Sequence, residues 1–516
     1  MDTLRTLVSN SLVLVFLGLC LSLASASAGA GPSLPPAIGV IPSDGHNLVI
    51  TDELAPNRLL LELSPPVHNW FAGTFANLPA GQPVTFGFSM TGKDSRGEPA
   101  DVTKWRGLAP VMTYADPTRY ESYEWFHRDA RGHWISGDPF KTEAERDAGA
   151  GPAPEQAAVP AELAAGFLAA DGRYWAPWRE VNATETLTGV NIFRITQTFD
   201  APTATVAMRV PFTYTYLQAL LARLQARRFP GVAVEEIGTT KAGRKLQIIR
   251  LDDPRARAGQ PPAKTILLVA REHATEPASS WVLTGVLTAL LQQTPEARRL
   301  RKDTTWLLLP IEDPDGSADA AFDRLTDLFL EAPDDEAMSP EVFAYARYFT
   351  KYIYDGRAVH VAVSLHNVEA NETEQVMCPF ITLRDKPPAL LFNQAFFQAL
   401  TARGFVTGDP QRPWAYGFTP FRLFGWCAEQ FGAFTLAYEV NDRYPAARLS
   451  LNRQQEIGAI LADAISAWLT TPEGKLVCAR ADQLARLKRL ERAVHYTQVD
   501  HNPDERTGVE LITRGF

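Results

Sequence analysis

Residues 265–277 read TILLVAREHATEP, and this stretch decides the fold. Five apolar residues follow its first threonine, a run that is typical of a strand buried on both faces of a sheet. Pro277 then stands in the first turn of a predicted helix, where a missing N–H costs nothing. We therefore expect His273 and Glu276 in a strand-to-helix turn, at the sheet edge where open α/β sheets bind their ligands.

The same alternation of apolar strands and helices extends over residues 214–472. Further strands are predicted at residues 245–251, 305–310, 359–365 and 434–438. Helices are predicted at residues 215–226, 279–292, 341–354, 388–402 and 453–469. Strands that alternate with helices indicate an α/β domain with a mixed or parallel sheet. Residues 473–516 are predicted to form a charged helix, to about residue 492, and an irregular tail.

Residues 31–213 have a different pattern. Short runs that alternate apolar and polar residues are separated by Gly, Pro, Asn and Asp, and aromatic residues are dense. The clearest runs are at residues 47–51, 58–63, 83–89 and 204–210. This pattern predicts an all-β sandwich that precedes the α/β domain. Residues 141–170, rich in Ala, Pro, Glu and Gly, predict an insertion into the sandwich.

The chain begins with one early cation, Arg5, then an apolar run at residues 12–23 and small residues at 24–28. This order predicts a signal peptide at residues 1–28, and hence a secreted or periplasmic protein. An uncleaved membrane anchor is the alternative, but the run is shorter than the ~20 residues that a membrane span needs. We therefore expect no stable membrane span after signal removal.

Composition limits the partners and the cross-links. The formal net charge is -9, whereas a nucleic-acid-binding domain needs a basic face, so no nucleic-acid partner is expected. Cys20 would leave with the signal. The remaining cysteines, Cys378, Cys427 and Cys478, allow at most one disulfide and leave one thiol.

The strand-to-helix turn has the donors of a metal site. An imidazole and a carboxylate three residues apart, His273 and Glu276, can bind one ion, and zinc accepts nitrogen and oxygen ligands. Two other histidines lie in the α/β region. His366 ends the strand predicted at residues 359–365, at the same sheet edge, whereas His360 begins it. The sequence therefore predicts one zinc ion per chain held by His273, Glu276 and His366; the alternative for His366 is a hydrogen-bonded core histidine.

Glu439 is the candidate general base. It ends another apolar strand, at residues 434–438, and so belongs to the same edge of the sheet. A glutamate beside a metal-held water can take its proton, because the metal lowers the pKa of that water toward ~7. A surface or salt-bridged glutamate is the alternative.

Several motifs occur in a fixed order: GTTKAGR at residues 238–244, REHATEPASSW at 271–281, DPDG at 313–316, SLHN at 364–367 and TLAYE at 435–439. With these motifs the chain resembles zinc carboxypeptidases of the carboxypeptidase A type, within them the cytosolic-carboxypeptidase-like branch. Residues 70–71, 105–110 and 211–216 are similar to the β-sandwich domain of that branch. The resemblance spans most of the chain after the predicted signal, and it implies a carboxypeptidase fold and a peptide substrate.

The resemblance also implies roles for two further residues. Arg324 lies after the DPDG turn, where the family has an arginine that polarises the scissile carbonyl. Tyr416 lies at about the family's distance upstream of the catalytic glutamate and is implied to bind substrate. One feature departs from the family, because no Asn-Arg pair that would grip a terminal carboxylate follows the DPDG turn. Arg357 and Arg443 are candidates to replace it.

Three functions fit these observations. The first is a metallopeptidase that hydrolyses peptide bonds near a C-terminus. The second keeps the zinc but acts as an amidase or deacylase on a small molecule or a cell-wall peptide, which the missing Asn-Arg pair favours. The third is a binding protein with a silent catalytic domain, in which the aromatic-rich sandwich binds a peptide or a glycan.

Overall fold

The computed structural model describes most of the chain, and the structural statements below concern only these residues. They are 37–64, 67, 70–90, 101–118, 126–128, 134–136, 179–187, 191–253, 264–292, 294–320, 339–367, 373–413, 415–416, 423–443 and 449–499. The predicted signal peptide and the predicted insertion at 141–170 lie outside the described residues. Ile38–Phe516 forms one compact unit.

The amino-terminal part of this unit is built from two five-stranded sheets, with the strand orders β1-β4-β12-β6-β9 and β10-β11-β5-β3-β2. Phe75 of β4 stacks on Phe86 of β5 with ring centroids 4.4 Å apart, so the two sheets face each other across an aromatic core. The predicted all-β sandwich is confirmed. Its strands are β1 (Gly39–Ile41), β2 (Leu48–Ala55), β3 (Arg58–Leu63), β4 (Ala72–Ala76), β5 (Pro83–Ser89), β6 (Val111–Thr113), β9 (Arg179–Glu180), β10 (Ala183–Leu187), β11 (Ile192–Thr198) and β12 (Thr203–Ala207).

Two smaller elements accompany the sandwich. The 3-10 helix η1 (Val102–Trp105) contributes Trp105, which is fully buried and lies 5.1 Å from Phe71 between ring centroids. The strands β7 (Phe126–Arg128) and β8 (Trp134–Ser136) pair with each other in a separate two-stranded sheet.

The carboxy-terminal part contains a nine-stranded mixed sheet in the order β13-β14-β16-β15-β17-β21-β19-β20, with β18 paired to β21. The four central strands β16, β15, β17 and β21 run parallel to one another, as their continuous apolar sequences indicate. The strands are β13 (Val232–Thr239), β14 (Lys245–Asp252), β15 (Lys264–Ala270), β16 (Thr304–Leu309), β17 (Val361–Asn367), β18 (Val376–Met377), β19 (Phe380–Ile381), β20 (Ala415–Tyr416) and β21 (Phe434–Val440).

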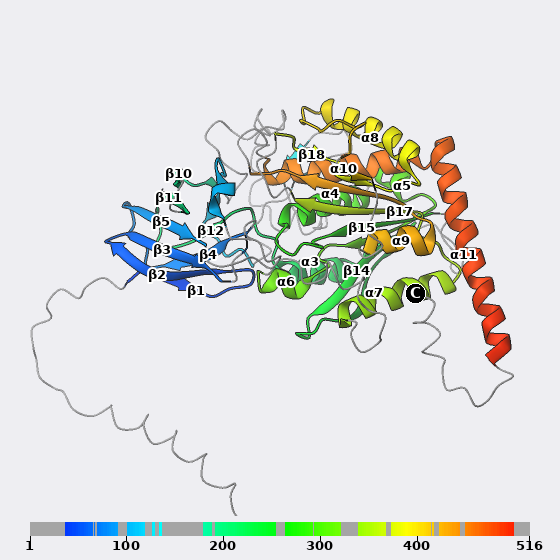
Figure 1. Ribbon diagram of the computed structural model, residues 1–516, viewed down its shortest axis with the longest axis horizontal. Coiled ribbons are helices and arrows are strands. Elements are labelled where there is room, and N and C mark those ends of the chain that lie inside the picture. The colour runs from blue at the N-terminus through cyan, green and yellow to red at the C-terminus, as the bar shows by residue number, and fades with distance from the viewer. Residues whose placement is uncertain are drawn as a thin grey trace, which may run out of the picture. The chain divides into compact units, whose positions relative to one another are not determined.

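Helices cover both faces of this sheet (Figure 1). Side chains of β15 alternate between two cores: Ile266 and Leu268 join the core beneath α4 and α10, whereas Leu267 joins the core beneath α7 and α9. The predicted α/β domain is thereby confirmed. The helices are α3 (Tyr214–Arg227), α4 (Pro277–Leu291), α5 (Pro295–Arg301), α6 (Pro314–Ala318), α7 (Pro340–Tyr354), α8 (Lys386–Thr401), α9 (Leu423–Phe431), α10 (Leu451–Trp468) and α11 (Pro472–Val499).

Helix α11 is longer than the sequence indicates, since it continues to Val499 rather than ending near residue 492. It packs against α7 and α9, the helices on one face of the sheet. Among the described residues, no helix is both long enough and apolar enough to cross a membrane.

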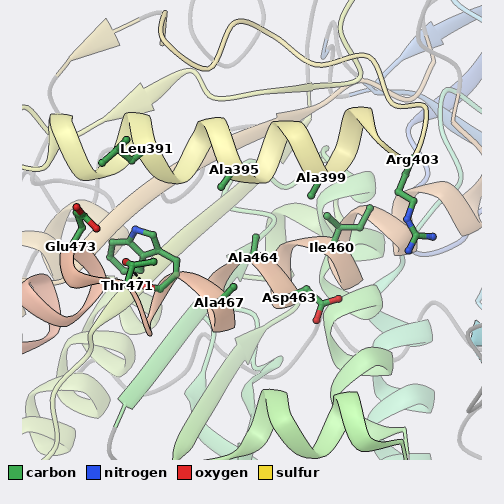
Figure 2. Close-up of a pocket in the computed structure, with 11 residues that line it drawn as sticks. Leu391, Ala395, Ala399, Arg403, Ile460, Asp463, Ala464, Ala467, Thr471 and Glu473 are labelled. Atoms are coloured by element: carbon green, nitrogen blue, oxygen red, sulfur yellow. Dashed lines mark hydrogen bonds between the residues drawn. The ribbon is translucent and has the colours of Figure 1, made fainter.

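A cavity of about 600 Å³ lies between α8 and α10. In Figure 2, Arg403 and Glu473 mark its two ends, and alanines of both helices, such as Ala395 and Ala464, line the space between. The lining contains none of the predicted metal ligands. The cavity therefore belongs to the helical layer and is separate from the site described below.

The sandwich and the large sheet share contacts next to the carboxyl end of β21. The guanidinium Nε of Arg209, which follows β12, lies 3.2 Å from Asp442 Oδ1, and both side chains are buried. Arg443 donates from Nη1 to the carbonyl oxygen of Ala109 (3.1 Å), and the amide of Ala109 donates to the carbonyl oxygen of Arg443 (3.1 Å). These bonds fix the segment that follows β21 against the sandwich.

Helices α4 and α10 approach so closely that only glycine fits at the contact. A Cβ on Gly458 would lie 1.9 Å from the carbonyl oxygen of Val282, and a Cβ on Gly285 would lie 1.9 Å from that of Gln455. These glycines let α10 lie directly on α4, the helix that begins just after Glu276.

Gly458→Ala should lower the free energy of unfolding by about 1–3 kcal/mol, because the new methyl group must push the two helices apart. Replacing glycine by alanine inside a helix usually raises the free energy of unfolding by ~1 kcal/mol, so the predicted change has the opposite sign. Urea denaturation measures the change. The matched control is Gly39→Ala, where a Cβ meets nothing within 4 Å; equal stability of the wild type and Gly458→Ala would contradict the prediction.

Candidate metal centre and active site

Strand register brings the predicted site residues to one edge of the sheet. In the parallel pair β15–β17, Ala270 lies opposite Leu365, so the turn that carries His273 follows directly beside His366. In the parallel pair β17–β21, His366 lies opposite Glu439. In both pairs the parallel strands end at the same edge of the sheet, so the residues at their carboxyl ends become neighbours.

His273, Glu276 and His366 form a cluster that can hold a metal ion. His273 Nδ1 lies 2.8 Å from Glu276 Oε1, and His366 Nδ1 lies 3.1 Å from Glu276 Oε2. The two Nδ1 atoms are 3.3 Å apart. Glu276 and His366 are buried, and the side chain of His273 is 12% exposed.

The geometry of this donor set fits zinc. Metal–ligand bonds of ~2.0–2.1 Å in a tetrahedron place neighbouring ligands about 3.3 Å apart, which is the separation of the two imidazole nitrogens. Two histidines and one glutamate are also a ligand set of catalytic zinc sites, which leave a fourth position open for water or substrate. The residues present therefore fit the ion that the donor chemistry indicates.

The charges around the cluster favour a cation. Burial would raise the pKa of Glu276, but the neighbouring His273 and His366 outweigh it and hold that pKa well below its ordinary value. Burial would likewise lower the pKa of His366, but Glu272, Glu276 and Glu439 raise it well above the ordinary value. Both shifts show that positive charge is stabilised between these side chains.

Backbone and amide groups fix the glutamate. The amide of Asn367 donates to Glu276 Oε2 (3.0 Å), and the side chain of Asn367 is held in turn by its bond to the carbonyl oxygen of Val440 (3.2 Å). At the start of α4, the hydroxyl of Ser279 donates to the carbonyl oxygen of Glu276 (2.6 Å). Glu276 is therefore oriented by β17 and α4 together.

Arg271 shapes the turn between the strand and the metal ligands. It has a positive φ of 64°, which lets the chain leave β15 sharply. Its guanidinium donates from Nε to the carbonyl oxygen of Ala274 (2.6 Å) and from Nη1 to that of Phe212 (2.9 Å). Burial lowers the pKa of Arg271 to about 10, while Asp44, Glu276 and Asp313 oppose that shift. Phe212, which lies between the sandwich and α3, thus helps to hold the turn that carries His273.

The DPDG turn supports the same loop from the neighbouring strand. Asp313 caps α6 by accepting the amide of Gly316 (2.8 Å). A Cβ on Gly316 would lie 2.7 Å from the Cβ of Ala274. Only glycine therefore permits the DPDG turn to lie this close to the turn that carries His273. Asp315 accepts hydrogen bonds from Arg244 Nη1 and from the hydroxyl of Thr240, each at 2.7 Å.

The structure places His360 away from the cluster. It precedes β17, and its Nδ1 accepts the amide of Thr265 (2.9 Å) while its Nε2 lies 3.0 Å from Asp482 Oδ1 on α11. This is the opposite end of the strand from His366. His360 therefore ties α11 to the sheet.

The remaining predicted residues differ in what the structure describes. Glu439 lies on β21 beside His366 and is partly buried. Tyr416 lies in β20, which pairs with β19 so that Tyr416 is opposite Ile381; its side chain is outside the description. Arg324 lies outside the described residues.

Neither arginine considered as a replacement for the Asn-Arg pair is available at this edge. Arg443 is fully buried and bonded to the carbonyl oxygens of Ala109 and Leu449. Arg357 follows α7, before β17 begins, and its guanidinium lies 5.0 Å from the ring centroid of Tyr352. Both guanidinium groups are thereby engaged in contacts within the fold.

Residues 217–325 match the family model of zinc carboxypeptidases. This segment therefore resembles that family. It contains His273, Glu276 and the DPDG turn, whereas His366 and Glu439 lie beyond the matched residues.

Curated relatives of this segment are cytosolic carboxypeptidases. Cytosolic carboxypeptidase 6 from Mus musculus is 31% identical over 106 residues, which are 20% of this chain and 20% of the relative. The protein of the same name from Caenorhabditis elegans is 32% identical over 108 residues, 21% of this chain and 23% of the relative. The matched part thus spans about a fifth of the length of these relatives.

Solved structures extend the likeness to the fold of most of the chain. The metallo-carboxypeptidase from Burkholderia cenocepacia covers 84% of this chain and 99% of its own, with a TM-score of 0.58 and 17% identity. The metallo-carboxypeptidase from Pseudomonas aeruginosa, in complex with (2-guanidinoethylmercapto)succinic acid, covers 84% and 98%, with a TM-score of 0.55 and 16% identity. At these identities the likeness shows a shared fold, which confirms the carboxypeptidase fold that the motifs imply.

The prediction of a secreted or periplasmic location is wrong, because the curated relatives that match are named cytosolic carboxypeptidases. Cys378, Cys427 and Cys478 are buried, and no disulfide joins them. An apolar run followed by small residues is a short compositional pattern, and it misled the prediction of location.

Sequence reasoning missed the residues that orient the candidate metal ligands. Asn367 and Ser279 act through Glu276, Arg271 through a backbone carbonyl, and Ser364 and Glu272 surround the far nitrogen of His366. Two of these carried a signal: Glu272 and Arg271 are charged residues directly after a buried strand, a position where charge needs a partner.

Asp315→Asn should destabilise the protein by about 1.5–3 kcal/mol at pH 7, because the charged hydrogen bonds with Arg244 are lost. Burial would raise the pKa of Asp315, but the bonds from Arg244 and Thr240 lower it below its ordinary value. A lowered folded-state pKa means that the stabilisation is complete above the unfolded pKa of about 4 and is lost as the pH falls through the folded value. The deficit of the variant in urea denaturation should therefore be constant above about pH 5 and shrink as the pH falls below about 4.

The control for this experiment is Asp319→Asn, since the half-exposed carboxylate of Asp319 lies 3.4 Å from the same arginine. Its effect should stay below about 1 kcal/mol. A deficit of Asp315→Asn that is independent of pH would show that the carboxylate charge plays no part.

Proposed function

We propose that the protein is a zinc metallocarboxypeptidase, which hydrolyses peptide bonds near a C-terminus with one zinc ion held by His273, Glu276 and His366. The observation that carries this proposal is the convergence of both Nδ1 atoms and the glutamate carboxylate within 3.3 Å of one another, beside Glu439. The family of residues 217–325 supports it.

When bound, the zinc ion would act as a Lewis acid that polarises a carbonyl oxygen and makes water more acidic. Glu439 is the general base in this proposal: from β21, opposite His366, its carboxylate takes a proton from the attacking water and later delivers it to the leaving amine. The partial burial of Glu439 keeps that proton transfer away from bulk solvent.

Two further residues complete the proposed site. Arg324 would stabilise the negative charge that develops on the carbonyl oxygen, because a guanidinium donates two parallel hydrogen bonds to such an oxygen or its neighbours. Tyr416 would contact the substrate from β20, a strand at the end of the same sheet. Both roles rest on the position of each residue relative to the family motifs.

A second candidate function is a zinc amidase or deacylase that acts on a small molecule or a peptide without a free terminal carboxylate. The missing Asn-Arg pair favours it. After the DPDG turn, the first such pair is Asn452-Arg453 on α10, where Arg453 lies 3.5 Å from the ring centroid of Phe405 and is buried. That arginine is committed to the helical layer and does not reach a substrate at the sheet edge.

Glu439→Gln should lower kcat by at least ~10²-fold on a peptide substrate, because general base catalysis typically contributes 10²–10⁴-fold. The variant should still contain one zinc per chain by elemental analysis, since Glu439 is not a ligand in the proposal. Glu236→Gln is the control; this glutamate pairs with Lys245 on β13 and β14, away from the site. Full activity of Glu439→Gln would refute the assignment of the base.

A matched pair of peptides separates the two functions. For a carboxypeptidase, we expect hydrolysis of peptides with free C-termini and no release of the last residue from the same peptides with amidated C-termini. Mass spectrometry of the products measures this directly. Equal cleavage of both forms would overturn the carboxypeptidase and support the amidase, whereas a wild-type protein without stoichiometric zinc would overturn both.

A further inference from the structure

Glu272 has no role in the proposed function, yet it lies against one of the proposed ligands. Its Oε2 is 3.5 Å from His366 Nε2, and the hydroxyl oxygen of Ser364 is 2.8 Å from the same nitrogen. All three residues are buried. Glu272 thus reaches past its neighbour His273 to a histidine on the adjacent strand.

The two nitrogens of His366 have distinct surroundings. Nδ1 faces Glu276 and His273, at 3.1 and 3.3 Å. Nε2 faces two oxygen-bearing side chains, those of Ser364 and Glu272. A neutral imidazole that offers Nδ1 to a metal must carry its proton on Nε2, so this N–H donates toward Ser364 and Glu272.

We propose that Glu272, together with Ser364, is a positioning residue that fixes the tautomer and the ring orientation of His366 for zinc binding. This inference rests on the proposed function, because it takes His366 as a zinc ligand. A carboxylate behind a ligating histidine also makes the imidazole a stronger donor, and loss of such a partner typically costs 10–100-fold in metal affinity.

The proposed role also bears on the cost of burying the charged carboxylate of Glu272. A buried carboxylate is costly to desolvate, and its cost is offset only when positive charge lies nearby. A zinc ion held by His366 would place positive charge near Glu272 and offset part of this cost.

The test is the zinc affinity of Glu272→Gln, measured on the full chain by competition with a chromophoric chelator. This variant keeps the shape of the side chain and removes its charge. We expect the affinity to fall by about 10–100-fold, whereas the melting temperature of the metal-free protein does not fall. A residue that merely supported the fold would show the reverse pattern, with lower metal-free stability and unchanged affinity of the folded fraction.

Two further variants sharpen the result. Glu341→Gln is the matched control, because Glu341 is also buried but accepts the amide of Lys241 (2.9 Å) at the start of α7; its zinc affinity should equal that of the wild type. Ser364→Ala should weaken zinc binding in the same direction as Glu272→Gln. The double variant should lose less affinity than the two single losses multiplied, because both residues act on one N–H.

The outcomes distinguish the inference from the function on which it rests. If the wild type binds one zinc and Glu272→Gln binds it within twofold of the wild type, the role of Glu272 is overturned and the metallopeptidase stands. If Glu272→Gln loses affinity only because its metal-free form is unfolded, the positioning role is likewise overturned. If the wild type binds no zinc, the proposed function and this inference fail together.

Discussion

The parallel register of β15, β17 and β21 is the constraint on which the site depends. Because the three strands run in one direction, the loops that leave them emerge at one edge, and residues far apart in sequence become neighbours there. A shift of one residue in β17 would turn His366 to the other face of the sheet. Close packing of α10 on α4 fixes the position of α4, whose N-cap is Glu276, and so helps to keep Glu276 beside His366.

The sandwich takes part in this constraint, since it supplies backbone acceptors to the catalytic part. Arg271 bonds the carbonyl oxygen of Phe212, and the indole of Trp281 on α4 bonds that of Val210 (3.2 Å). Arg209 faces Asp442 just after β21. The strand that carries Glu439 and the turn that carries His273 are thus both attached to the amino-terminal sheets, which explains why Ile38–Phe516 is one compact unit.

Much of this arrangement was predictable from local patterns. Apolar runs locate the strands, and the position of Pro277 locates the start of α4, so the placement of His273 at a strand end follows from sequence alone. The contacts of Glu272, Asn367 and Arg271 do not follow, because each depends on which strands become neighbours and on how a polar side chain is satisfied after burial. Location was mispredicted, since a short apolar run carries little information about the mature chain.

The orienting contacts also explain why so much charge is tolerated at this edge. Glu272 and Glu276 are both buried there, beside the imidazoles of His273 and His366. The raised pKa of His366 and the lowered pKa of Glu276 show the same preference for positive charge. A divalent cation between the ligands satisfies that preference without a proton on either imidazole. In the proposed function the acidic residues thereby favour a filled site, and the metal would be part of what stabilises the edge of the sheet.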